Sequence, residues 1–218
     1  MGDMARQETT DYDSKLVSLE QALATIRPGS RIYLGTGCAA PRSLLAGLEG
    51  MQPGPPDLEF VSFVTTSALP MKTGASQTRY RHRTFFVGSD VQSLAASGQL
   101  DYVPISLEEV PGLLASGRLP IDVALLQVSP PDARGYVSLG VSVDLAPAVL
   151  GVARSVIAEV NPAMPRTHGE SFVHLGRFDA LVKVDTPVAE YRHPEIGEIA
   201  TRVARYIASI VDDGSTLQ

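Results

Sequence analysis

The chain has 218 residues, of which 44% are hydrophobic and 19% are charged, and its formal net charge is −6. This length suits one large domain or two small ones with a sizeable core, and the negative charge argues against nucleic acid as the main partner. No apolar run approaches the roughly 20 residues that cross a bilayer, so we expect no membrane association. The single Cys38 excludes an internal disulfide framework and suits a reducing compartment, so we expect a cytoplasmic protein.

The chain begins with a polar stretch that is followed by signals for a helix and a strand. Residues 1–14 are predicted to be a flexible tail, and residues 15–218 are predicted to form the folded domain. Ser18-Leu-Glu-Gln21 is a capping-box pattern that predicts a helix ending before Pro28. Arg31–Leu34 is then predicted to be a short strand.

A glycine-rich loop follows this strand directly. Gly35-Thr36-Gly37 leads to Pro41, which is predicted to lie in the first turn of a helix reaching Leu48. A loop between a strand and a helix N-terminus can aim N–H groups at an anion or a developing oxyanion. The alternative is a small-residue turn that lets the helix pack closely on the strand. The full glycine pattern of dinucleotide-binding folds is missing, which disfavours a dehydrogenase.

The middle of the chain continues to alternate between strand and helix patterns. Leu58–Thr65 is predicted to be a buried strand, with Ser67 at its carboxyl end as a candidate substrate contact. The stretch from Lys72 to Arg83 is basic, and either forms a solvated face or places cations near a phosphate. Further elements are predicted as a strand at Thr84–Val87, a helix at Val91–Ala96, a strand at Tyr102–Ile105 and a helix from a Ser106 capping box to Ala115.

The stretch from Ile121 to Asp144 is the most informative part of the sequence. The apolar run Val123–Val128 predicts a strand covered on both faces, and Ser129-Pro130-Pro131 ends it because proline removes backbone donors. Open α/β sheets bind ligands outside the carboxyl ends of their strands, which makes Ser129 and Pro130 candidate pocket residues. A stiff connector without a functional role is the alternative.

The last third contains a second loop stiffened by prolines. A helix at Leu145–Ala153 and a strand at Val156–Val160 lead into the loop, which presents Asn161, Met164, Arg166 and His168. Arg166 either serves the site or only pins this loop to neighbouring groups. A short strand is predicted at Ala180–Val184, and a terminal helix with one apolar face is predicted at Pro194–Val211.

Strands that alternate with helices predict an α/β fold with an open, mostly parallel sheet flanked by helices. Two stretches carry a family resemblance: Gln127 to Asp144, with its Ser-Pro-Pro-Asp-x-x-Gly-Tyr core, and Val156 to His174, with Asn-Pro-Ala-Met-Pro-Arg-Thr-His-Gly. In these motifs, and from about Lys15 to Gln218, the chain resembles the acetyl-CoA hydrolase/transferase family. That family includes the 4-hydroxybutyrate CoA-transferases of class I, and the resemblance covers its amino-terminal domain, a CoA-transferase/NagB-RpiA-like half.

The resemblance implies a CoA-transferase that moves CoA between acetyl-CoA or a similar ester and a short carboxylic acid. Such enzymes use a glutamate nucleophile that forms a glutamyl-CoA intermediate. In the family this glutamate lies past a Gly-Ile-Gly segment in the second half, and neither Glu159 nor Glu170 matches its position. We therefore assign no catalytic residue here, and expect a carboxyl-terminal half as partner, homo-oligomer formation and no activity of this chain alone.

Coenzyme A is expected as a substrate, and no metal is expected because the histidines lack metal-ligand spacing. A nucleophilic role for Cys38 is disfavoured, because no cation or base is paired with it in a recognisable motif. The alternatives are an acetyl-CoA hydrolase and a non-catalytic acyl-CoA-binding or interaction domain. The expected pocket residues are Gly35, Thr36, Gly37, Ser67, Ser129, Pro130, Asn161, Met164, Arg166 and His168.

Overall fold

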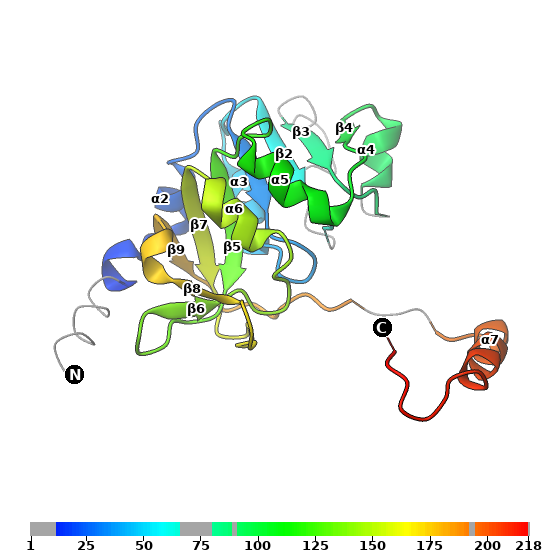
Figure 1. Cartoon of the computed structure of the whole chain (residues 1–218). Coiled ribbons are helices and arrows are strands. Elements are labelled where there is room, and N and C mark those ends of the chain that lie inside the picture. The colour runs from blue at the N-terminus through cyan, green and yellow to red at the C-terminus, as the bar shows by residue number, and fades with distance from the viewer. Residues whose placement is uncertain (1–11, 66–79, 89–90, 192–194, 218) are drawn as a thin grey trace.

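A seven-stranded parallel sheet forms the centre of the molecule (Figure 1). The computed structural model describes residues 12–65, 80–88, 91–191 and 195–217. The strand order is β4-β3-β2-β1-β5-β7-β9. The bounds of these strands are β1 Arg31–Leu34, β2 Leu58–Ser62, β3 Tyr80–Thr84, β4 Leu100–Tyr102, β5 Val123–Val128, β7 Ser155–Val160 and β9 Ala180–Lys183. The predicted open, parallel α/β sheet is confirmed.

Helices cover both faces of the sheet. Leucines of α2 and α3 pack on one face with Ile32, Phe60 and Leu125, and α5 and α6 pack on the other face with Tyr33 and Leu126. The helices are α2 Leu19–Leu23, α3 Arg42–Gly50, α4 Gln92–Ala96, α5 Val110–Ala115, α6 Ala146–Val152 and α7 Glu198–Ala208, with 3-10 turns η2 Leu107–Glu109 and η3 Leu175–Arg177. Because both faces are covered, all six residues of β5 are buried, as its unbroken apolar run predicts.

The direction of the chain reverses at the centre of the sheet. From β1 the chain moves outward through β2 and β3 to β4, and it then returns to place β5 on the other side of β1. The connection after β1 enters α3 on one face, whereas the connection after β5 leads to α6 on the opposite face. Neighbouring loops therefore diverge at the carboxyl ends of β1 and β5, which is where open α/β sheets leave a crevice.

The predicted strand at Thr84–Val87 is wrong, because the strand lies earlier, at Tyr80–Thr84. Tyr80, His82 and Thr84 are buried on one face, and Arg83 reaches Glu59 at 3.0 Å on the other. Ion pairing thus lets a basic segment join the sheet, and the described end of the basic cluster serves the fold. Lys72 and Arg79 lie outside the described residues.

A small antiparallel sheet formed by β6 (Tyr136–Ser138) and β8 (Phe172–His174) lies beside the main sheet and was not predicted. Each strand has only three residues, too few for a periodic signal to stand out. This ribbon joins the two proline-stiffened loops that follow β5 and β7.

The amino-terminal segment packs on the outer side of β9. Tyr12, which falls within the expected tail, packs against the core, and Leu16 forms a parallel bridge with Leu181. The ammonium of Lys15 donates to the carbonyl oxygens of Leu175 and Phe178 at 3.0 and 2.8 Å. The ordered fold therefore begins before residue 15.

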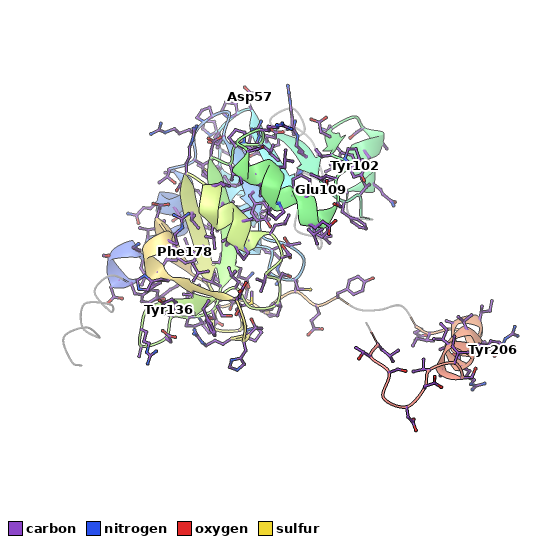
Figure 2. All side chains as sticks on the ribbon, viewed as in Figure 1. Asp57, Tyr102, Glu109, Tyr136, Phe178 and Tyr206 are labelled. Atoms are coloured by element: carbon purple, nitrogen blue, oxygen red, sulfur yellow. The ribbon has the colours of Figure 1, made fainter. Side chains whose placement is uncertain are left out.

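Helix α7 stands apart from the sheet, at the far end of a long connection (Figure 1). It is shorter than the predicted Pro194–Val211, and none of its residues is buried. Tyr206 on α7 is 73% exposed, and Figure 2 shows it well away from Phe178 in the sheet body. No helix in the described part of the chain has the length and apolar character to cross a membrane.

Candidate active-site edge of the sheet

Three loops meet at the carboxyl ends of adjacent strands, as the sequence predicts. The glycine loop follows β1, the Ser129-Pro130-Pro131 loop follows β5, and the Asn161 loop follows β7. Because β1, β5 and β7 are parallel neighbours, these corners lie on one edge of the sheet, at the reversal between β1 and β5 where open α/β sheets generally leave a crevice.

The glycine loop is held close to the sheet. The N–H of Gly35 donates to Leu125 O at 2.9 Å, and that of Gly37 donates to Val64 O at 2.8 Å. Gly37 has φ +55°, and a Cβ at Gly35 would lie 3.1 Å from Ala39 O, so both positions favour glycine. Among the described residues, the N–H groups of Thr36 and Cys38 have no hydrogen-bond acceptor; Thr36 is buried and Cys38 is half-buried.

Thr36 connects the glycine loop across the crevice to the segment before α6. Its hydroxyl donates to Asp144 Oδ1 at 2.9 Å and lies 3.1 Å from the hydroxyl of Tyr33. Burial raises the pKa of Tyr33, the negative charge of Asp144 raises it further, and the Thr36 hydrogen bond opposes both. Tyr33 is therefore a neutral hydrogen-bonding group that fixes Thr36.

The loop after β5 is fastened by Arg166 from the loop after β7. The Arg166 guanidinium donates to the carbonyl oxygens of Pro130 and Tyr136 at 3.1 and 3.0 Å, and to Asp132 Oδ2 at 3.0 Å. Its cationic carbon also lies 5.0 Å from the ring centre of Phe172. Arg166 therefore holds two loops in register, as the second of its two sequence interpretations predicts.

The other predicted pocket residues divide into buried and exposed ones. Ser129, Asn161 and Met164 are 0%, 0% and 2% exposed, so their side chains belong to the wall of the edge. Ser129 Oγ accepts from Ser138 N at 2.9 Å, and a Cβ at Gly140 would collide with the sulfur of Met164. His168 is exposed, and Pro130 and Gly37 are half-buried. Ser67 lies outside the described residues.

Sequence reasoning did not single out two buried polar residues beneath the edge. Gln127 on β5 and Glu159 on β7 are register partners that face α3. Burial raises the pKa of Glu159 to about 7, although hydrogen bonds from the N–H groups of Leu44 and Ser43 and the charge of Arg42 act in the opposite direction. The sequence signal that could have identified them is a large polar residue inside each of two mostly apolar strands.

The edge offers backbone donors and hydroxyl groups in a framework of fixed geometry. Its accessible rim is formed by Gly37, Cys38, Ser142 and Asp144, which are half-buried or exposed. Over the described ranges, no group of three histidine, cysteine or acidic side chains is placed to hold a metal ion. Backbone N–H donors favour a polar, anionic group here, whereas the Asp144 carboxylate on the rim acts against one.

Comparison with known proteins agrees with this arrangement. The sequence profile described as acetyl-CoA hydrolase/transferase N-terminal domain matches residues 1–192. The 4-hydroxybutyrate coenzyme A transferase of Clostridium kluyveri is 38% identical over 207 residues, which are 95% of this chain and 48% of that protein. The crystal structure of RipA from Yersinia pestis superposes with a TM-score of 0.89 and 30% identity, covering 97% of this chain and 52% of that one.

A second solved structure, the 4-hydroxybutyrate CoA-transferase of Porphyromonas gingivalis, gives a TM-score of 0.70 with 27% identity, covering 95% of this chain and 48% of that one. The fold and these matches define a domain of a CoA-transferase. The chain belongs to the acetyl-CoA hydrolase/transferase family, as its motifs predict. It spans about half the length of the curated relatives that it matches.

Proposed function

We propose that this chain is the amino-terminal half of an acyl-CoA:carboxylate CoA-transferase that moves CoA between acetyl-CoA, or a similar ester, and a short carboxylic acid. The observation that carries the proposal is the 38% identity with half of a 4-hydroxybutyrate coenzyme A transferase over 95% of the chain. The N–H groups of Thr36 and Cys38 in the glycine loop, which have no acceptor among the described residues, support a role of that half in binding.

The proposed reaction uses a glutamate carboxylate from a carboxyl-terminal half. The carboxylate attacks the thioester carbonyl, so a C–O bond forms, the C–S bond breaks and CoA leaves as thiolate. The thiolate then attacks the glutamyl carbonyl of the mixed anhydride, which releases the donor acid and leaves a glutamyl-CoA thioester. The acceptor carboxylate repeats these two steps in reverse order, and the glutamate is regenerated as acceptor acyl-CoA departs.

In this proposal, the present chain binds and positions the substrates but supplies no nucleophile. Each attack places negative charge on a carbonyl oxygen, and N–H donors in a fixed loop stabilise such charge. Thr36 and Cys38 provide these donors, and Ser142 and Asp144 form the opposite rim. Buried Ser129, Asn161 and Met164 shape the wall without touching the substrate. The exposed apolar face of α7 packs against the carboxyl-terminal half.

The test is reconstitution with a separately expressed carboxyl-terminal half of a family member. Acetyl-CoA is supplied with butyrate or 4-hydroxybutyrate as acceptor, and acyl-CoA products are separated by chromatography. We expect product only when both halves and an acceptor acid are present. Each half alone is the control, and a mixture without acceptor measures hydrolysis.

Two outcomes would contradict the proposal. Formation of a stable complex without transfer to any acid would favour a non-catalytic acyl-CoA-binding domain, which calorimetry with acetyl-CoA would reveal. Release of CoA at the same rate with and without acceptor would show that water is the acceptor, and the protein would then serve a hydrolase.

A further inference from the structure

Three buried polar side chains lie beneath the glycine loop, on the sheet face that α3 covers. Gln127, Glu159 and Asn161 are 4%, 0% and 0% exposed. Burying polar groups is costly unless they are hydrogen-bonded, so their partners show what this cluster holds in place. We call Gln127, Glu159 and Asn161 the polar cluster.

On one side the polar cluster holds the end of the glycine loop and the start of α3. Gln127 Nε2 donates to Ala40 O at 2.9 Å, and Glu159 Oε1 accepts from the N–H of Leu44 at 2.6 Å. The residue before α3 is Pro41, which makes no side-chain capping bond. Glu159 therefore supplies, from β7, the negative cap that the helix N-terminus lacks in its own sequence.

On the other side the polar cluster holds the segment that leaves β9 toward α7. Asn161 Nδ2 donates to Gln127 Oε1 at 3.0 Å and to Thr186 O at 2.8 Å. Arg42, the first residue of α3, donates to Pro187 O. Two bonds therefore fasten the exit segment, residues 184–187, to the structure that carries the glycine loop.

We propose that Glu159, Gln127 and Asn161 are positioning residues that lock the glycine loop and the exit segment into one unit, so that the segment leading to α7 and the substrate loop move together. Asn161 is bonded to the exit segment directly and to the glycine-loop side through Gln127, and Glu159 contacts that side at the first turn of α3. The relevance of this coupling to turnover rests on the proposed function, whereas the coupling itself does not.

Glu159 makes the lock sensitive to charge. Burial raises its pKa to about 7, so that neutral pH lies within its titration. The charged group facing it from α3 is Arg42, and its register partners on β5 and β9 are the uncharged Gln127 and Val182. In the described part of the chain, Glu159 Oε2 has no hydrogen-bond partner, so the carboxyl group contacts the start of α3 through Oε1 alone. Because the cost of burying the charge outweighs the hydrogen bonds and the attraction to Arg42, ionisation of Glu159 as the pH rises through 7 loosens both sides of the unit.

The test uses this chain without substrate, followed by amide NMR from pH 5.5 to 8.5. We expect the amide signals of Leu44 and Thr186 to shift together, with one shared midpoint near 7. Glu159→Gln keeps a hydrogen-bond acceptor but removes the titrating group, so the chemical shifts of both amides should no longer change with pH. Glu49→Gln, which changes an exposed glutamate in the last turn of the same helix, is the matched control and should leave both titrations unchanged.

Hydrogen exchange provides the second measurement. Asn161→Ala should speed exchange at both Leu44 and Val184 by about tenfold, because it removes the bonds shared by the two sides. A Thr186 signal that stays constant while Leu44 titrates would overturn the proposal, as would faster exchange at Val184 alone. If Asn161→Ala does not fold, the Glu159→Gln titration still decides. None of these outcomes depends on transfer activity, so the proposed function is tested separately.

Discussion

Buried polar side chains at the centre of the sheet differ in their hydrogen bonding from a buried histidine in its outer part. Beneath the β5–β7 edge, Gln127 and Asn161 are buried and bonded at 2.8–3.0 Å. On β3, His82 is 1% exposed, yet neither ring nitrogen has a hydrogen-bond partner among the described residues, and its ring stacks on Phe60 at 5.4 Å between centroids. Hydrogen-bonded polar side chains therefore set the geometry at the centre, whereas buried His82 in the outer part is held by packing.

The largest expected effect comes from removing that packing. Phe60 is 0% exposed and contacts the rings of both Tyr80 and His82. Phe60→Ala should lower the free energy of unfolding by about 3–5 kcal/mol, through lost burial and a cavity. Urea denaturation followed by circular dichroism measures it, and a loss below about 1 kcal/mol would contradict a packing-dependent outer sheet.

The two regions should also respond to pH with opposite sign. Burial lowers the pKa of His82 from 6.5 to about 4, so its contribution is present above pH 6.5 and is lost as pH falls toward 4. Burial raises the pKa of Glu159 from 4.5 to about 7, so its contribution is present below pH 4.5 and is lost as pH rises toward 7. For each residue the pKa in the folded protein differs from its ordinary value by about 2.5, which corresponds to a change of about 3 kcal/mol in the free energy of unfolding.

Between pH 4.5 and 6.5 the His82 contribution rises with pH while the Glu159 contribution falls. The unfolding free energy of the unmutated chain should therefore change little with pH on account of these two residues. His82→Leu should expose the Glu159 slope, with stability falling as pH rises. Glu159→Gln should expose the His82 slope, with stability rising as pH rises. Urea denaturation at several pH values measures both slopes, and equal slopes in the two variants would refute the assignment.

Polar substitutions at neutral pH compare the two regions directly. Gln127→Leu should cost about 2–3 kcal/mol, because Ala40 O loses its hydrogen bond from Gln127 and the Asn161 amide loses one of its two acceptors. His82→Leu should be neutral or stabilising, because no hydrogen bond is lost. Thermal unfolding at pH 7.5 ranks the pair, and a larger loss for His82→Leu would reverse the comparison.

Arg166→Lys probes the loops above the central edge. A lysine keeps the charge but cannot reproduce the forked contacts to Pro130, Tyr136 and Asp132. We expect a loss of about 1–2 kcal/mol and faster hydrogen exchange in residues 130–136. Arg134→Lys is the control, since Arg134 is exposed in the same loop. A loss for Arg166→Lys no larger than that for Arg134→Lys would show that the forked contacts of Arg166 add nothing beyond its charge.

The smallest effect on stability is expected at α7. Ile199 is 76% exposed, so Ile199→Glu should change the unfolding free energy of the sheet by less than about 0.5 kcal/mol. The same change should weaken association with a carboxyl-terminal half, because it places a charge in the apolar stripe. Analytical ultracentrifugation measures association, and unaltered binding would indicate that the stripe is not the contact.

The fold was predictable wherever one signal dominated. The bounds of β1 and β5 agree with the prediction, because short apolar runs with turn residues on both sides admit few alternatives. The Ser18 capping box is also confirmed, with reciprocal bonds between Ser18 and Gln21 at 2.9 and 3.2 Å. The strand at Tyr80–Thr84 was missed because Arg83 is paired with Glu59 across the sheet, a contact that a local pattern does not contain.

The site was predictable as a place but not as a set of contacts. Parallel neighbours bring their carboxyl ends to one edge, which is why the three loops were expected to meet there. Which side chains face outward depends on tertiary bonds: Ser129 and Asn161 are turned inward, whereas Ser142 and Asp144 reach the rim. Gln127 and Glu159 carried a readable signal, since a polar residue in a fully buried strand implies a bonded partner.

The amino-terminal segment has a consequence for the sheet as a whole. Because Val17 donates to Leu181 O at 3.0 Å, the outer backbone of β9 is already paired by the chain itself. An unpaired edge strand is a template for adding a strand from another molecule. Deleting residues 12–17 would expose this template, so the shortened protein should aggregate through β9 even where its core remains folded.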